Sequence, residues 1–281
     1  MIRLLERNIA SIEKRLVLVA PSYVALPECF QNVTADPGRH QQLVQEMQRL
    51  RGSIYLQDGA VQQDQLTPDG LHRTPEDDRS WHLLMLNSRR EVSSCAWYME
   101  HDEAARFEHL RVRNCGLARL EGWRERLSQA VESELQRARQ DGLRYAEVGG
   151  WAVAKGCRCT SEGLLLALAA YSLGRTLGGA LGITMATVRH SSSTILRRLG
   201  GSLLEVAGSI VPPYYDPNYR CQMEILRFDS RQPSAKYAGL IELLGEQMAD
   251  VKVIALSPAA PALAPAGMPD AFAAWSTGMA V

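Results

Sequence analysis

The feature that most constrains this chain is a strand, loop and helix in its middle. Residues 145–154 (YAEVGGWAVA) have the β-favouring composition of a buried strand, and residues 164–179 (LLLALAAYSLGRTLGG) are apolar enough for a buried helix. The loop between them, KGCRCTSEG, places several backbone N–H groups at the start of the helix. Such a loop predicts a binding site for phosphate or pyrophosphate.

The loop lacks the two best-known nucleotide-binding motifs. It contains no Gly-Lys-Ser/Thr, so it is not a P-loop, and no G-x-G-x-x-G follows the strand, so it is not a dinucleotide-binding fingerprint. These absences make nucleoside triphosphates and NAD weak candidates for the phosphate-bearing ligand.

Charge, hydrophobic runs and cysteine spacing limit the partners and the location that the chain can have. The 31 Lys and Arg residues balance the 31 Asp and Glu residues, so no net charge favours nucleic acid. Residues 1–23 lack a continuous hydrophobic region, and the longest apolar run, 164–173, is too short to span a membrane. The six cysteines include one close pair, Cys157 and Cys159, without a second pair at metal-ligand spacing. We therefore expect a cytoplasmic protein with reduced thiols, no metal and no transmembrane segment.

The remaining pattern predicts an α/β protein with a mixed, mainly antiparallel sheet flanked by helices in three layers. Two β-rich runs, 81–87 and 92–100, form a hairpin, and the segment 53–64 suggests a strand, an Asp58-Gly59 turn and a following strand or loop. The other predicted strands are 182–188, 203–207 and 221–228. Helices are predicted at 1–16, 39–50, 122–140, 191–201 and 234–249.

These elements divide the chain into four parts. Residues 1–50 form an N-terminal helical arm, 51–232 the main domain, 233–256 a C-terminal helix and short strand, and 257–281 an Ala/Pro-rich tail that we expect to be disordered.

Two segments resemble the signatures of the GNAT superfamily of acyltransferases. The loop Arg158 to Gly163 resembles the R/Q-x-x-G-x-G/A loop that wraps the pyrophosphate of coenzyme A, with Ser161 in place of the middle glycine. The segment ATVRHSSSTILRRLGG resembles the second signature, a strand leading into a short helix, with Gly201 where an aromatic residue is usual. The resemblance covers about residues 53–229 and implies the GNAT-like fold.

Within the superfamily, the chain most resembles the long-chain N-acyl amino acid synthases and, more distantly, the acyl-homoserine lactone synthases. The resemblance rests on the tract 51–70, on Glu147 at the head of its strand and on the closing pattern PPYYDPNYRCQMEILRFD. Two departures stand out. Gly150 replaces an arginine of the lactone synthases, which argues against their S-adenosylmethionine acceptor, and Leu196 replaces the tyrosine that many acetyltransferases use as general acid.

The resemblance implies transfer of a medium or long acyl chain to the amine of an amino acid or small amine by direct attack. The donor is acyl-CoA or acyl-ACP (acyl carrier protein), whose phosphopantetheine thioester is a co-substrate, with no permanently bound cofactor. Glu147 is the expected base, and the backbone N–H of Val153 or a neighbour is expected to face the thioester carbonyl. The donor loop supplies Arg158, Cys159, Thr160, Ser161 and Gly163, and the acceptor is expected near Tyr55 and Asp58.

Other interpretations stay open from the sequence. The chain is also compatible with a CoA-dependent acetyltransferase, or with an acyl-CoA sensor that binds without turnover. Cys157 or Cys159 as a nucleophile, and His82 or His190 as a base, are weaker alternatives, because a lone histidine or cysteine is more often structural.

Overall fold

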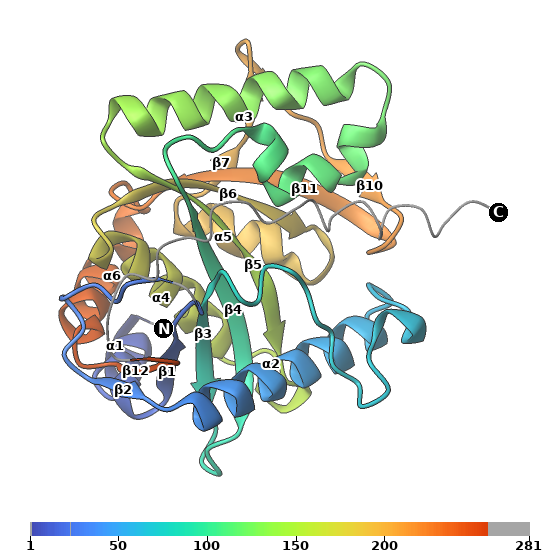
Figure 1. Ribbon diagram of the computed structural model, residues 1–281. Coiled ribbons are helices and arrows are strands. Elements are labelled where there is room, and N and C mark those ends of the chain that lie inside the picture. The colour runs from blue at the N-terminus through green and yellow to red at the C-terminus, as the bar shows by residue number, and fades with distance from the viewer. Residues whose placement is uncertain (1, 23, 258–281) are drawn as a thin grey trace.

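The computed structural model describes residues 2–22 and 24–257 (Figure 1). The helices are α1 (Ile2–Ile9), α2 (Pro37–Gln57), α3 (Trp123–Gln140), α4 (Glu162–Thr176), α5 (Ser192–Leu199) and α6 (Ala235–Met248). The longer strands are β1 (Leu16–Val19), β3 (Trp81–Leu86), β4 (Val92–His101), β5 (Arg144–Val153), β6 (Ala180–Thr187), β11 (Cys221–Asp229) and β12 (Lys252–Ala255). Short strands are β2 (Val33–Ala35), β7 (Ser202–Leu203), β8 (Glu205–Val206), β9 (Ser209–Ile210) and β10 (Tyr214–Asp216).

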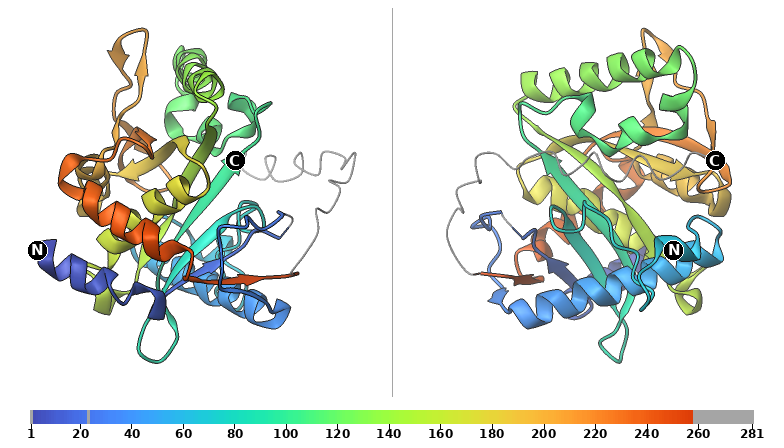
Figure 2. Two further views of the ribbon diagram at one scale, coloured as in Figure 1. Left: turned by 90° about the vertical axis from the view of Figure 1, so that its left-hand side faces the viewer. Right: turned by 45° about the vertical axis from the view of Figure 1, so that its right-hand side comes forward.

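One large sheet organises the described residues, in the order β10-β11-β6-β5-β4-β3-β1-β12-β2. Most neighbours are antiparallel, whereas β5 and β6, β1 and β12, and β12 and β2 run parallel. Helices cover both faces, with α2 and α3 on one and α4, α5 and α6 on the other (Figure 2). The predicted three-layer α/β fold is therefore confirmed.

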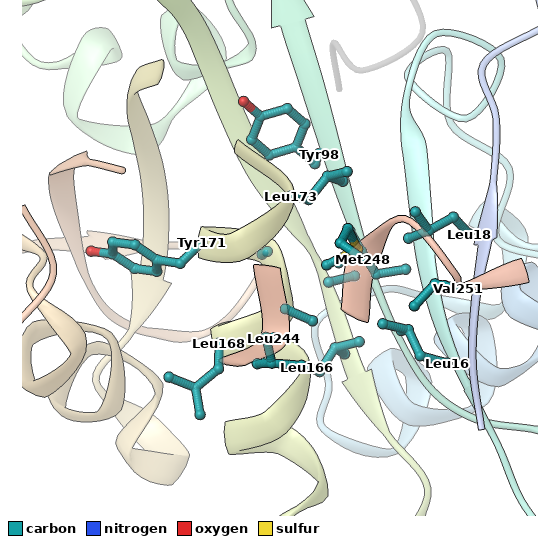
Figure 3. Close-up of a cluster of buried hydrophobic side chains, with 14 of the residues drawn as sticks. Leu16, Leu18, Tyr98, Leu166, Leu168, Tyr171, Leu173, Leu244, Met248 and Val251 are labelled. Carbon is teal, nitrogen blue, oxygen red and sulfur yellow. The ribbon is translucent and has the colours of Figure 1, made fainter. Parts of the chain in front are cut away.

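The core is divided by the sheet. Helix α4 is buried on nearly every side, because it lies between the sheet and α6, and its leucines pack beside Leu244 and Met248 (Figure 3). On the opposite face, α3 and α2 each cover a separate apolar cluster. Tyr98 and Leu173 are fully buried on the α4 side, so the centre of the sheet is a rigid support for the strands beside it.

The strand predicted at the start of segment 53–64 is wrong, whereas the predicted turn at Asp58-Gly59 is present and is followed by a loop. Helix α2 continues to Gln57, and Asp58 is its C-cap residue. Gly59 has φ +72°, the left-handed conformation that ends many helices. The helix prevails because Leu43, Met47 and Ile54 all face the sheet at helical spacing.

Both ends of the described chain enter the same sheet. Residues 1–16 are not one helix, because α1 ends at Ile9 and a short turn leads into β1. Strand β1 pairs with β3 on one side and with β12, from the C-terminal segment, on the other. The predicted helix at 234–249 and the short strand after it are present as α6 and β12. Residues 258–281, most of the predicted disordered tail, lie outside the described residues.

Among the described residues, no helix is both long enough and apolar enough to cross a bilayer.

Candidate functional site

A β-bulge in β5 shapes the centre of the candidate site. Trp97 of β4 pairs with Gly149, whereas Cys95 pairs with Ala152, so β5 has one residue more than β4 over this stretch. Gly150 has φ +63°, and a Cβ atom there would lie 2.2 Å from the Trp97 ring. Only glycine fits this conformation beside the indole, which explains the Gly149-Gly150 pair.

Beyond the first residues of β5, the two parallel strands part. Their register runs from Arg144 and Ala180 to Glu147 and Ile183, and the described residues form no further pair between them. We call the remaining edges, residues 148–153 of β5 and 184–187 of β6, the β5/β6 fork. The Ala154 N–H bonds to the Ser93 carbonyl at 2.8 Å, and amides alternate along a strand, so the Val153 N–H points into the fork.

The start of α4 forms a cradle of backbone donors at the open end of the fork. The Thr160 hydroxyl accepts from the Glu162 N–H at 3.2 Å, and Asn8 of α1 donates to the Ser161 hydroxyl at 3.0 Å. The N–H groups of Gly163 and Leu164 have no acceptor among the described residues. Unpaired N–H groups at a helix start favour an anion.

A buried carboxylate lies directly beneath this cradle. Glu162 is 5% exposed and accepts from Arg15 and from the Ser93 hydroxyl, both at 2.5 Å. The Arg15 cation compensates the charge of Glu162, so the carboxylate anchors the start of α4 without leaving an unpaired negative charge under the anion site.

Arg158 and Asp58, predicted separately for the donor and the acceptor, form an ion pair. The Arg158 Nη2 atom lies 3.1 and 3.3 Å from the two Asp58 oxygens. The main-chain carbonyl of Asp58 accepts from Arg189 at 2.9 Å, and His190 Nε2 lies 3.9 Å from the Asp58 carboxylate. The end of α2 is thereby joined to the loops that follow β5 and β6.

Glu147 lies at the closed end of the fork, where β5 and β6 make their last pair. Its side chain is buried, and its oxygens accept from the backbone N–H groups of Arg111 and Val112 at 2.9 and 3.1 Å. His101 Nε2 is 3.0 Å away. Three donors fill three of the about four acceptor positions of a carboxylate, so one position remains.

Tyr55 belongs to an aromatic and charged cluster on the α2 side of the sheet. Its ring centroid is 5.6 Å from that of His72 and 6.1 Å from that of Tyr219. Arg111 pairs with Glu76 at 2.8 Å. Burial alone would raise the pKa of Glu76, but the Arg111 guanidinium outweighs this effect and the pKa is lowered. The cluster therefore contains a negatively charged carboxylate and a positively charged guanidinium beside aromatic rings.

His72 is held neutral in this cluster. Burial and the neighbouring Arg51 cation lower its pKa to about 4. Its Nδ1 accepts from Arg51 Nε at 3.1 Å, so its proton resides on Nε2 and that atom is a hydrogen-bond donor.

The structure also shows where the alternative bases and nucleophiles suggested by the sequence lie. His82 is buried, and its Nε2 lies 2.7 Å from the Asp77 carbonyl, with burial lowering its pKa. Burial and the Glu162 carboxylate raise the pKa of Cys157, which disfavours a thiolate nucleophile. Cys159 is exposed in the donor loop, and His190 lies beside Asp58.

Residues of the site that were not identified from the sequence include His72, Glu76, Arg111 and Arg189. Each lies in a loop or a short turn that has no periodic pattern, and each acquires its role through contacts between distant segments. The single sequence signal was the Arg189-His190 pair before the predicted short helix.

Comparison with known proteins supports the fold. No protein-family model and no curated protein matches the sequence. A solved CoA-dependent acyl-homoserine lactone synthase, BjaI, with SAM and isopentyl-CoA, is 12% identical over 88% of this chain and 95% of that chain, with a TM-score of 0.53. The chain has the GNAT-like fold. FeeM, an N-acyl amino acid synthase from uncultured soil microbes, is 12% identical over 75% of this chain and 93% of that one, with a TM-score of 0.44.

Proposed function

We propose that this protein is an N-acyltransferase that moves an acyl group from acyl-CoA or acyl-ACP to the amine of an amino acid or small amine. The observation that carries the proposal is the β5/β6 fork with a cradle of backbone donors at its open end. A thioester with a phosphate-bearing arm fits this arrangement, because its phosphate and its carbonyl both need hydrogen-bond donors, at opposite ends of an extended chain.

On the donor side, the proposed phosphate site consists of Arg158 and the loop residues Cys159 to Gly163. The unpaired N–H group of Gly163 and the positive end of the α4 dipole favour the anion. The thioester arm would then follow the unpaired edges of the fork toward the bulge. The Val153 N–H, which points into the fork, is the proposed donor to the carbonyl oxygen.

The reaction requires an amine to lose a proton while it attacks. The nitrogen forms a bond with the thioester carbon, the C–S bond breaks, and the proton that the amine loses is passed from the base through water to the departing thiolate, so that the base is regenerated. We propose Glu147 as the acceptor of the amine's proton, directly or through a water, because it lies where the fork closes and retains one acceptor position.

The acceptor is proposed to bind beside Tyr55, with Asp58 at the rim. The Nε2–H of His72 and the guanidinium of Arg111 are donors that suit a carboxylate. Glu76 is an anion that suits an ammonium group. Both kinds of group occur together in amino acids, which favours an amino acid over a simple amine.

The test is turnover with defined donors and acceptors. Purified protein is incubated with acyl-CoAs and acyl-ACPs from C2 to C16 and with pooled amino acids, and N-acyl products are identified by mass spectrometry. A thiol-reactive dye is unsuitable because the exposed Cys159 would contribute to the signal.

The outcomes separate three functions. Formation of long-chain N-acyl amino acids supports the proposal, and activity confined to acetyl-CoA identifies an acetyltransferase. Thioester binding without product identifies a sensor. Failure to bind any thioester contradicts all three, because each depends on the fork as a donor site.

A further inference from the structure

We propose that Asp58 is an internal anion that occupies Arg158 in the free protein and that the phosphate group of the donor must displace. This inference rests on the proposed donor site and adds a residue that controls access to it. Asp58 would therefore weaken the binding of coenzyme A thioesters, whose pyrophosphate competes with it for Arg158, and would leave the binding of phosphate-free thioesters unchanged.

The contacts of Asp58 join three segments that are distant in the sequence. Its carboxylate meets Arg158 of the donor loop, and its carbonyl accepts from Arg189 Nη1 at 2.9 Å. The Nη2 atom of Arg189 also donates to the carbonyls of Tyr219 and Arg220, at 2.5 and 2.8 Å. The loops after β5 and β6, and the turn before β11, thus meet at the end of α2.

These contacts bear directly on the anion site. Arg158 directs its guanidinium to Asp58, whereas the N–H groups of Gly163 and Leu164 have no acceptor among the described residues. The cation that the donor loop supplies for phosphate is thus already paired with a carboxylate. A carboxylate has one charge and two oxygens, whereas a pyrophosphate has more of both, so the donor is the stronger partner for Arg158.

The same loops contain backbone conformations that are costly for residues other than glycine. Cys159 has φ +62°, His190 +62°, Ser191 +60° and Arg220 +47°. Each left-handed residue of this kind is strained and persists where surrounding contacts hold it. Four such residues lie in the loops that Asp58 and Arg189 join. Replacement of Asp58 by a phosphate as the partner of Arg158 therefore takes place among segments whose backbone is strained.

The decisive experiment measures binding of coenzyme A, and of phosphate-free pantetheine, by calorimetry. We expect Asp58→Asn to lower the Kd for coenzyme A about three- to fivefold, the range expected for removing a partly exposed competing ion pair. Pantetheine affinity should stay the same because pantetheine has no group that competes for Arg158. The control is Asp64→Asn, which removes an exposed carboxylate that makes no ion pair with any described residue and should alter neither Kd.

A double-mutant comparison shows whether the effect passes through Arg158. Asp58→Asn should tighten coenzyme A binding in the wild-type background and have at most half that effect when Arg158→Gln is also present. An equal gain in both backgrounds would mean that Asp58 acts by general repulsion of the ligand and would overturn the inference. Melting temperatures of all variants verify that each is folded.

Two results separate this inference from the proposed function. If the wild type binds coenzyme A and Asp58→Asn binds it equally or more weakly, Asp58 orients Arg158 for the phosphate instead of competing with it, and this inference alone fails. If the wild type binds neither coenzyme A nor any acyl thioester, the donor site itself is wrong and both fail.

Discussion

At the scale of single residues, the position of Glu147 suits both a structural role and a catalytic one. Its three hydrogen bonds fix the turn at residues 111–114 against the sheet, which is a structural task, and its position at the closed end of the fork suits a base. Replacement by glutamine keeps the size of the side chain and some of its hydrogen bonds, so it separates charge from shape.

We expect Glu147→Gln to lower kcat by about 10²- to 10⁴-fold, the usual contribution of a general base. The limb of the pH–rate profile that reports ionisation of the base should also disappear. Measurement of kcat/KM from pH 5 to pH 9, together with the melting temperature, checks this. If the melting temperature falls while the shape of the pH profile persists, Glu147 is a positioning residue for the 111–114 turn and the base lies elsewhere.

At the scale of elements, the bulge in β5 explains why a parallel pair of strands opens in the middle of a sheet. Strand β5 follows β6 only to Glu147, and the extra residue beside Trp97 then changes its direction. The close approach of the Trp97 ring to Gly149 and Gly150 fixes that change in place. The bulge thus links sequence, through two glycines, to the shape of the donor site.

We predict that Gly150→Ala destabilises the protein by about 2 kcal/mol or more, because alanine disfavours φ +63° and its Cβ would collide with Trp97. Coenzyme A affinity should fall with it as the fork deforms. Gly239→Ala in α6 is the matched control, since its Cβ meets open space, and it should be neutral or stabilising by up to about 1 kcal/mol. Urea unfolding and calorimetry measure both effects, and unchanged affinity in Gly150→Ala would contradict the role of the bulge.

The sequence predicted elements better than it predicted their ends and contacts. The hairpin of β3 and β4, helix α3 and the β5-loop-α4 unit have strong periodic patterns and were identified. The segment before the Asp58-Gly59 turn was predicted wrongly as a strand because the same dipeptide ends helices and closes hairpins, and only the burial of Ile54 against the sheet decides between them. The Arg158 to Asp58 pair, across 100 positions, follows from the fold and has no local signal.

At the scale of the whole molecule, a network of buried charged and polar groups fixes the loop at residues 58–80. Arg51 is 1% exposed and pairs with Asp77 at 2.8 Å, and Gln48 also donates to that carboxylate. Arg51 further donates to Nδ1 and to the carbonyl of His72. Since the network lies beside Tyr55, folding of this loop and assembly of the proposed acceptor site are coupled.

The network makes stability depend on pH. The native His72 has a pKa of about 4, whereas an unfolded histidine has one near 6.5, so the unfolded chain binds a proton first as the pH falls. Stability is therefore full above pH 6.5 and declines toward pH 4. At 1.36 kcal/mol per pH unit, His72 alone accounts for a loss of about 2 kcal/mol between pH 6.5 and pH 5.

His72→Asn tests this origin, because its side-chain oxygen replaces Nδ1 as acceptor for Arg51 but does not titrate. We expect urea unfolding to show a decline between pH 7 and pH 5 that is smaller in the variant by about 2 kcal/mol. His82, whose pKa burial also lowers, is present in both proteins, so its contribution cancels in the difference. Equal declines would place the pH dependence at His82 or elsewhere and would show that His72 takes up a proton in the folded protein as readily as in the unfolded chain.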